Sequence, residues 1–217
     1  NLPGLIAKYC SESEVKKFIH VSAIGANAES NSLYQQTKFS GETKALANFK
    51  NTVIIRPSVV CGNEDNFTNL FAKLSLSPII PVVKPEYKFQ PILADDVATA
   101  IVRAIDIKKN EGKIYEIGGP TIVSFNDMVK SIISTIGKKR FIVEMPMPLA
   151  KIQAALFSLM PKPLLTKDQC EILNEADNIV SNKYLTLKDL NIKPTDVQKA
   201  MPKWLWRFRS GGEFAKI

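Results

Sequence analysis

Leu33-Tyr34-Gln35-Gln36-Thr37-Lys38 is the stretch on which the fold and the function of this chain depend most. In a helix, Tyr34 and Lys38 lie one turn apart on the same face, with Cβ atoms about 6 Å apart. A nearby ammonium favours the phenolate and lowers the pKa of a phenol. Such a phenol can exchange a proton with a carbonyl or an alcohol, and the lysine can hold a ribose hydroxyl. The spacing therefore predicts an acid–base or nucleotide-binding pair, with a plain surface pair as the alternative.

Context separates this pair from a second one with the same spacing. Tyr184 is also followed by lysine four residues later, but it lies among polar residues with no strand before it, and we interpret that pair as surface. Before Tyr34, the apolar run Lys17–Ser22 predicts a short strand that ends in a small hydroxyl residue. A strand, a small-residue loop and a helix with the Tyr–Lys pair form a coherent site, which includes Ser22.

Strand and helix patterns alternate along the chain. The expected strands are Phe18–Ser22, Thr52–Arg56, Lys113–Ile117 and an edge strand at Phe141–Glu144, and the expected helices are Leu2–Ser13, Ser32–Phe49, Asp65–Leu76, Asp96–Ile107 and Leu149–Met160. This order predicts an α/β fold, a Rossmann-like doubly wound parallel sheet with a small α/β C-terminal lobe. Ligands of such folds bind beyond the carboxyl ends of the strands, where Ser22 and Pro57 fall.

Local signals add detail to this plan. Asp95 is predicted to cap the helix that follows it, and Thr166 begins a capping box with Gln169. Arg56, inside an apolar strand, is either half of a structural salt bridge or a ligand contact. The helix Leu149–Met160 is apolar on most sides, so it is either core or a partner-binding helix.

Charge restricts the class of partner. The chain has 217 residues and a formal net charge of +8, which favours an anionic partner such as a dinucleotide or an acidic lipid or protein surface. Its basic residues are scattered apart from Lys138-Lys139-Arg140 and the Trp204–Arg209 tail, so no nucleic-acid partner is expected, and the tail is the better candidate for docking. No apolar run reaches the roughly 18 residues that a membrane span needs.

Metal chemistry is not expected either. Three cysteines are widely spaced, and His20 is the only histidine. This composition predicts a reduced compartment and no metal site. We interpret His20 as a core or strand-face histidine with a local hydrogen bond.

An ordered series of motifs resembles a known superfamily. Phe18–Ala26, the Tyr34/Lys38 pair and Gly41-Glu42 resemble the short-chain dehydrogenases/reductases, in their extended or atypical branch. Ile54–Gly62 and Phe89–Ala98 resemble the later hallmarks of that superfamily. Three further stretches are similar to the nucleotide-binding accessory subunits of respiratory complex I and their bacterial relatives: His20–Ala23, Gly62–Phe67 and Trp206–Arg209.

The resemblance implies roles for several residues. Tyr34 would be the acid–base group, Lys38 would adjust it and bind ribose, and Ser22 would orient a substrate oxygen. Pro57-Ser58-Val59 would meet the nicotinamide end of NAD or NADP, and the resemblance slightly favours NADPH. Residues 1–145 would form a partial NAD(P)-binding domain that includes substrate-side segments, and residues 146–217 a mainly helical C-terminal lobe.

One departure from the superfamily matters for function. Its Gly-x-Gly-x-x-Gly or Gly-x-x-Gly-x-x-Gly turn, where a pyrophosphate binds, does not occur in this sequence. About the first third of the superfamily's fold is therefore expected to be absent, which would leave a strand edge exposed. Ser22 is the only hydroxyl residue at its strand end, and Ala23 is the other position that could correspond to the superfamily's serine or threonine.

Two functions remain open. The first is a non-catalytic accessory or assembly subunit of NADH:quinone oxidoreductase that binds NAD(P)H. The second is an active NAD(P)-dependent epimerase, dehydratase or ketoreductase that uses Tyr34 and Lys38. The resemblance implies a location in the bacterial cytoplasm or the mitochondrial matrix, where the protein could lie peripherally at the inner membrane. It also implies that the partners are other complex I subunits or the membrane surface.

Overall fold

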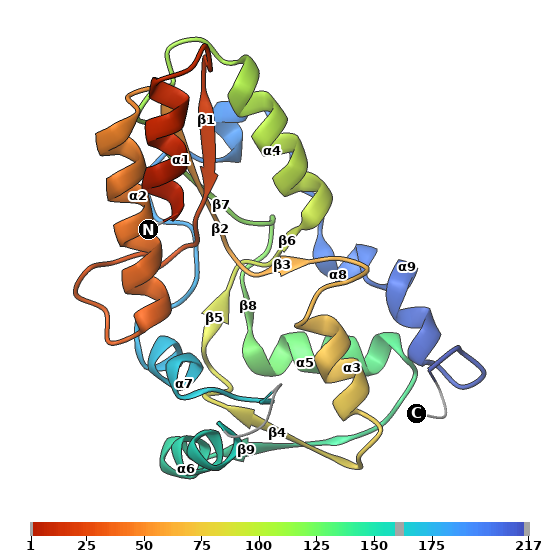
Figure 1. Cartoon of the computed structure of the whole chain (residues 1–217). Coiled ribbons are helices and arrows are strands. Elements are labelled where there is room, and N and C mark those ends of the chain that lie inside the picture. The colour runs from red at the N-terminus through yellow and green to blue at the C-terminus, as the bar shows by residue number, and fades with distance from the viewer. Residues whose placement is uncertain (1, 159–162, 215–217) are drawn as a thin grey trace.

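A three-stranded parallel sheet forms one half of the molecule (Figure 1). The computed structural model describes residues 2–158 and 163–214. The sheet order is β1 (Phe18–Val21), β2 (Thr52–Pro57) and β7 (Ile114–Ile117), all parallel. Every residue of β2 is buried, as expected for a central strand covered on both faces. The structure confirms the predicted Rossmann-like α/β fold and places β1 at the sheet edge.

Helices lie on both sides of this sheet. α1 (Leu2–Ser11) packs on α2 (Leu33–Asn48), and Figure 1 shows both on one side of β1, with α4 (Ala94–Asp106) on the other. α2 begins where the sequence predicted, because the side chain of Ser32 accepts a hydrogen bond from the backbone N–H of Gln35. This helix carries the Tyr34/Lys38 pair.

The other half of the molecule is a lobe of short helices and two-residue to five-residue strands (Figure 1). β4 (Ile79–Val83) pairs in parallel with β9 (Phe141–Met145), and these form a ribbon outside the main sheet. The remaining elements are β3 (Val60–Cys61), α3 (Thr68–Leu74), β5 (Lys88–Phe89), β6 (Ile92–Leu93), β8 (Val123–Ser124), α5 (Phe125–Thr135), α6 (Met147–Phe157), α7 (Lys167–Asn174), η1 (Leu187–Leu190), α8 (Val197–Ala200), α9 (Pro202–Leu205) and η2 (Trp206–Phe208).

Two main cores hold these halves. One joins the main sheet to α4 and η1, with Ile55 and Tyr115 among its buried side chains. The other joins α3 and α5 to the C-terminal segment, where Phe71, Met128 and Phe208 are buried together. The division into domains 1–145 and 146–217 stays a prediction, and the second core is shared across residue 145.

Helix α4 differs from expectation in two ways. It begins at Ala94, and Leu93 is its N-cap, so Asp95 lies inside the first turn and the predicted cap is wrong. Its carboxylate still lies near the helix N-terminus, where negative charge is favourable. The buried stripe consists mainly of small residues, Ala100 and Ala104 with Val97, whereas the larger side chains of Val102 and Ile105 are exposed.

The C-terminal tail also differs from expectation. Trp204, predicted to dock on a partner, is only 7% exposed and its indole N–H donates to the Thr68 hydroxyl at 3.0 Å. Arg207 and Arg209 donate to backbone carbonyls of Asn63 and Thr135. The tail therefore packs on its own chain, and of its two tryptophans only Trp206 is exposed.

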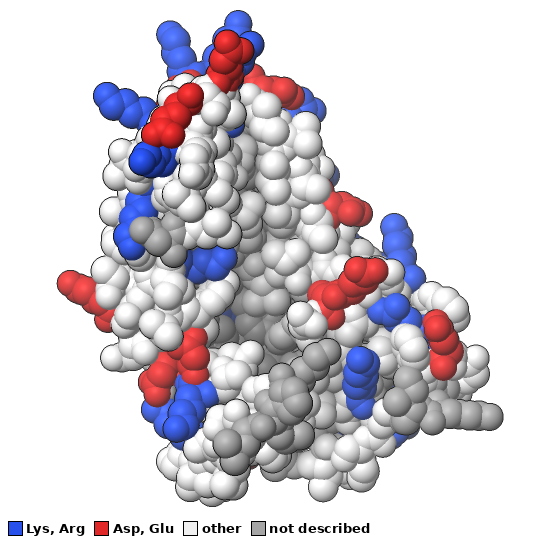
Figure 2. Space-filling model, viewed as in Figure 1, with Lys and Arg blue, Asp and Glu red and all other residues white. Residues whose placement is uncertain are grey.

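The apolar helix expected at Leu149–Met160 is α6, which ends at Phe157; Leu159 and Met160 lie outside the described residues. The capping box of Thr166 and Gln169 is present at the start of α7. Within the described part of the chain, no helix has the length and apolarity to cross a membrane. Basic side chains on the face shown in Figure 2 are dispersed among acidic ones and form no continuous stripe.

Candidate functional site

The carboxyl ends of β1 and β2 lie side by side, as the fold predicted. The backbone N–H of Ser22 donates to the carbonyl of Ile55 at 2.7 Å, and that of Ile24 donates to the carbonyl of Pro57 at 3.1 Å. Ser22 is 4% exposed, and its hydroxyl has no hydrogen-bond partner among the described residues. Buried polar groups are normally paired, so this hydroxyl is a candidate contact for a bound molecule.

Tyr34 and Lys38 lie one turn apart on α2. The Lys38 Nζ is 5.5 Å from the centroid of the Tyr34 ring and lies over the ring face, a cation–π arrangement. Partial burial raises the pKa of the Tyr34 phenol above its ordinary value. The predicted lowering of this pKa by the lysine is therefore wrong, because desolvation of the phenolate outweighs an ammonium that faces the ring.

His20 lies close to this pair, on the strand that faces α2. Burial, and then the positive charge of Lys38, lower the pKa of the imidazole, while Glu42 opposes them. Its Nε2 atom is buried without a hydrogen-bond partner among the described residues, so the expected local hydrogen bond at that atom is not present. The imidazole therefore reports on the position of the Lys38 ammonium.

The single histidine allows a direct test of this geometry. We expect the His20 ring to titrate below the ordinary value of 6.5 in an NMR titration, and its pKa to rise in Lys38→Gln. His20 takes up its proton near pH 6.5 in the unfolded chain and only at lower pH in the folded chain. The free energy of unfolding should therefore fall as the pH drops below 6.5. Lys44→Gln, an exposed position on the same helix, is the control and should leave the titration unchanged. A pKa at or above 6.5 would contradict this placement.

The Pro57-Ser58-Val59 loop is fixed by the C-terminal segment. The Ser58 hydroxyl donates to the backbone and side-chain oxygens of Asn178 at 3.0 and 2.7 Å, and accepts from the N–H of Gln90 at 3.2 Å. The hydroxyl of Ser58 therefore already forms its hydrogen bonds within the protein. Val59 lines an apolar pocket. The predicted cofactor roles of Pro57, Ser58 and Val59 stay predictions, as do those of Ser22, Tyr34 and Lys38.

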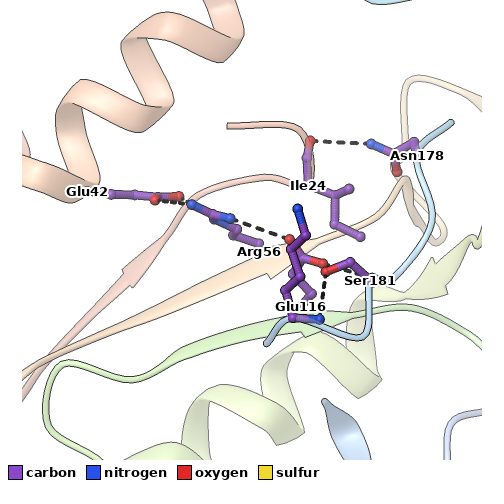
Figure 3. Close-up of polar contacts among 7 residues, drawn as sticks. Ile24, Glu42, Arg56, Glu116, Asn178 and Ser181 are labelled. Carbon is purple, nitrogen blue, oxygen red and sulfur yellow. Dashed lines mark hydrogen bonds and ion pairs between the residues drawn. The ribbon is translucent and has the colours of Figure 1, made fainter. Parts of the chain in front are cut away.

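A buried ion-pair network lies beneath this loop (Figure 3). Arg56 of β2 forms two hydrogen bonds to the Glu42 carboxylate of α2, at 2.9 and 2.6 Å, and a longer one of 3.4 Å to Glu116 of β7. Glu116 also accepts from the N–H of Ser181 at 2.9 Å. Burial alone would lower the pKa of Arg56, but the hydrogen bonds and charge of Glu42 raise it. The guanidinium stays charged and connects the Tyr34 helix to two strands.

Tyr184, predicted to lie on the surface, belongs to this network. Its ring packs on the guanidinium of Arg56, with 4.7 Å between the guanidinium carbon and the ring centroid. Both residues line a polar pocket of about 300 Å³, together with Asn178. The surface interpretation is wrong because the segment after Asn178 crosses back over β7, a contact between residues far apart in the sequence. Lys188 itself is exposed.

Two carboxylates from the C-terminal lobe hold the start of α2. Asp168 of α7 accepts from the backbone N–H of Leu33 at 2.6 Å and from the Ser32 hydroxyl at 2.9 Å. Glu175 accepts from the Ser30 hydroxyl and the Asn31 N–H, both at 2.8 Å. A carboxylate at a helix N-terminus is electrostatically favourable, so the lobe stabilises the turn that carries Tyr34.

Sequence reasoning missed most of these supporting residues. Glu116 could have been found, because it is a charged residue inside an apolar strand and lies opposite Arg56 in the parallel register. Asp168, Glu175 and Asn178 had no such signal, since their partners are more than 100 residues away in the chain.

Comparison with known proteins identifies the family. The family described as "RmlD substrate binding domain" matches residues 25–209 of this chain. The chain belongs to this family. The match covers the Tyr34 helix, the Pro57 loop and the C-terminal lobe, so the RmlD substrate-binding family spans both halves of the structure, as the predicted extended short-chain dehydrogenase/reductase resemblance implied.

Several individual proteins are also similar to this chain in sequence. The chain is 32% identical over 215 residues to a Mus musculus protein named "NADH dehydrogenase [ubiquinone] 1 alpha subcomplex subunit 9, mitochondrial", and 30% identical over 207 residues to the Dictyostelium discoideum protein of the same name. These alignments cover 97% and 94% of this chain but 56% and 58% of the relatives. The chain thus spans just over half the length of these proteins.

Solved structures share the fold. A dTDP-4-dehydrorhamnose reductase from Clostridium acetobutylicum has a TM-score of 0.66 and 18% identity, covering 94% of this chain and 69% of that one. A UDP-glucose 4-epimerase from Thermotoga maritima, solved with UDP-glucose, has a TM-score of 0.68 and 17% identity, covering 96% and 68%. At this identity, the likeness establishes the Rossmann-like fold of the RmlD family and leaves the substrate open.

Proposed function

We propose that this chain belongs to an accessory or assembly subunit of NADH:quinone oxidoreductase, complex I, and that it binds NAD(P)H without turning it over. One observation carries the proposal: sequence similarity over nearly the whole chain to mitochondrial proteins named as subunit 9 of NADH dehydrogenase [ubiquinone]. Because the chain spans just over half of those proteins, the activity and partners of the whole protein are part of the proposal. The mitochondrial matrix, or the bacterial cytoplasm, is the corresponding location.

A nicotinamide dinucleotide fits the residues at the strand ends in part. The buried, unpaired hydroxyl of Ser22 offers a contact, and the Lys38 ammonium offers a donor for a ribose hydroxyl. Ser58 would contribute only backbone atoms, since its hydroxyl is engaged with Asn178. Such a cofactor supplies a transferable hydride when bound. Structural neighbours solved with NADP or NAD support this class of ligand, and either form remains part of the proposal.

The state of Tyr34 supports binding over turnover. Its raised pKa keeps the phenol protonated at neutral pH, where it can donate a hydrogen bond but is not activated as a base. The lysine that would activate it lies over the ring face. These features match a site that holds a cofactor for structural reasons.

Exposed apolar side chains support association with another complex I subunit. Leu149, Ile152 and Leu156 of α6 are exposed, and so are Phe141 and Val143 of the neighbouring strand β9. Small residues on the other side of α6 pack with Val83 of the β4/β9 ribbon, so these groups belong to one end of the molecule. Exposed apolar surface of this kind marks protein–protein interfaces.

Dinucleotide titration tests the cofactor part of the proposal. We expect saturable binding of NADPH or NADH, followed by fluorescence, and a loss of affinity of about ten-fold in Lys38→Met, because a charge-assisted hydrogen bond worth ~1.5 kcal/mol is removed. Lys44→Met, on the same helix, is the matched control and should bind as the wild type does. If neither dinucleotide binds, the cofactor part of the proposal fails.

The alternative is an active NAD(P)-dependent epimerase, dehydratase or ketoreductase. It is favoured by the structural likeness to reductases and epimerases together with the Tyr34/Lys38 pair. Tyr34→Phe separates the two when complex I assembly, cofactor binding and turnover are each measured for this variant. The accessory proposal expects unchanged complex I assembly and cofactor binding, whereas turnover that disappears in this variant would establish the enzyme.

A further inference from the structure

A second pocket lies next to the Pro57-Ser58-Val59 loop and differs in chemistry from the polar pocket beside Arg56. Its volume is about 230 Å³. Ten of its thirteen lining residues are Val, Leu, Ile or Phe, and none of the described residues that line it is charged. Apolar protein cavities of roughly 150 Å³ stay dry and bind benzene, so a pocket of this size and lining suits a small hydrocarbon body.

Aromatic rings build one wall of this pocket. Phe67 lies at the centre of the group, with ring centroids 5.3 Å from Phe71 and Phe89 and 5.7 Å from Phe125. Such rings are rigid and tilted or edge-on to one another, which presents both faces and edges to a flat or extended guest. The opposite wall comes from α7 and the segment before it, where Leu164 is half exposed at the mouth.

Two hydrogen-bond donors that form only long hydrogen bonds within the protein lie at one end of the pocket. The Tyr87 hydroxyl donates to the Ala176 carbonyl over 3.3 Å, and the Asn178 side-chain amide donates to the Ile24 carbonyl over 3.5 Å. Burial, with the nearby charges of Asp177 and Glu175, raises the pKa of Tyr87 to about 12, so its proton is retained. Both residues also line the polar pocket. This end therefore offers donors to an acceptor oxygen.

We propose that this pocket binds an uncharged, largely hydrocarbon molecule with one carbonyl or hydroxyl oxygen, whose chain packs on the Phe67 group and whose oxygen meets Tyr87 and Asn178. A ligand with a charged head group is excluded. Such a group would lose its hydration on entering the pocket, and no described residue of the lining carries a charge that could compensate for this loss. A nucleotide sugar does not suit this lining, because its many hydroxyls and phosphates would find few partners. The proposal stands whether or not the chain binds a dinucleotide.

Prodan, an uncharged naphthalene ketone whose emission shifts to the blue in apolar surroundings, is the probe. We expect saturable binding with a blue shift. Ile172→Trp, which adds bulk to the α7 wall, should weaken binding by at least about ten-fold. Ile152→Trp is the matched control, an exposed isoleucine on α6 outside the pocket, and should bind as the wild type does.

A second variant protects the test against misfolding. Leu164→Asp places a charge at the half-exposed mouth and should also weaken prodan binding by at least about ten-fold, with Leu149→Asp on α6 as its control. Competition defines the ligand class: 1-decanol should displace prodan, and decanoate should not. The inference is overturned if prodan does not saturate, if both pocket variants bind it as the wild type does, or if decanoate competes as well as 1-decanol.

Discussion

Replacing Arg56 by methionine is expected to lower the free energy of unfolding by about 3–5 kcal/mol, the cost of leaving buried charges without their partner. The guanidinium is almost fully buried, and it neutralises the carboxylates of Glu42 and Glu116, which are equally inaccessible to water. Methionine fills similar space but provides no charge. Urea unfolding followed by circular dichroism measures the loss. Arg103→Met, an exposed arginine on α4, is the control and should change stability by less than about 0.5 kcal/mol.

The cause of this loss can be separated from simple packing. Adding Glu42→Gln and Glu116→Gln to Arg56→Met removes the unpaired charges, so the triple variant should recover part of the lost stability. Arg56→Lys should be intermediate, because lysine keeps the charge but cannot form the paired hydrogen bonds to Glu42. If Arg56→Met costs no more than Arg103→Met, the network does not hold α2 to the sheet.

Trp204→Ala is expected to destabilise the protein by about 3–5 kcal/mol, the usual cost of deleting a buried aromatic side chain. The indole contributes to the core formed with α3 and α5 and also donates to Thr68. Trp206, two residues later, is 54% exposed. It is the chain's only other tryptophan, so Trp206→Ala is a matched control that should cost less than about 1 kcal/mol.

Circular dichroism should follow this comparison, since each substitution removes one of the chain's two tryptophans and so changes the fluorescence signal itself. Equal losses in the two variants would show that the tail does not pack as the structure places it. A large loss for Trp204→Ala alone would show that the tail stabilises the C-terminal lobe and leaves Trp206 available for a partner.

The sequence by itself determined the parallel α/β fold and the Tyr34 helix. These features depend on local patterns: the β-branched runs of β1 and β2, the hydroxyl of Ser32 at a helix start, and the capping box at Thr166. Such signals involve residues within a few positions of one another, so they can be read without knowing the fold. The ordered motifs also indicated the superfamily, and the RmlD family match confirmed it.

Tertiary structure decided the chemistry of the site. The spacing of Tyr34 and Lys38 placed them on one face, but only the packing showed that burial raises the pKa of the phenol and that the ammonium lies over the ring. Tyr184 and Trp204 were assigned to the surface or to a partner because their neighbours in sequence are polar or basic. Each is instead covered by segments distant in the sequence, Tyr184 at Arg56 and Trp204 at Thr68. Burial depends on what the rest of the chain places against a residue, and sequence spacing does not record it.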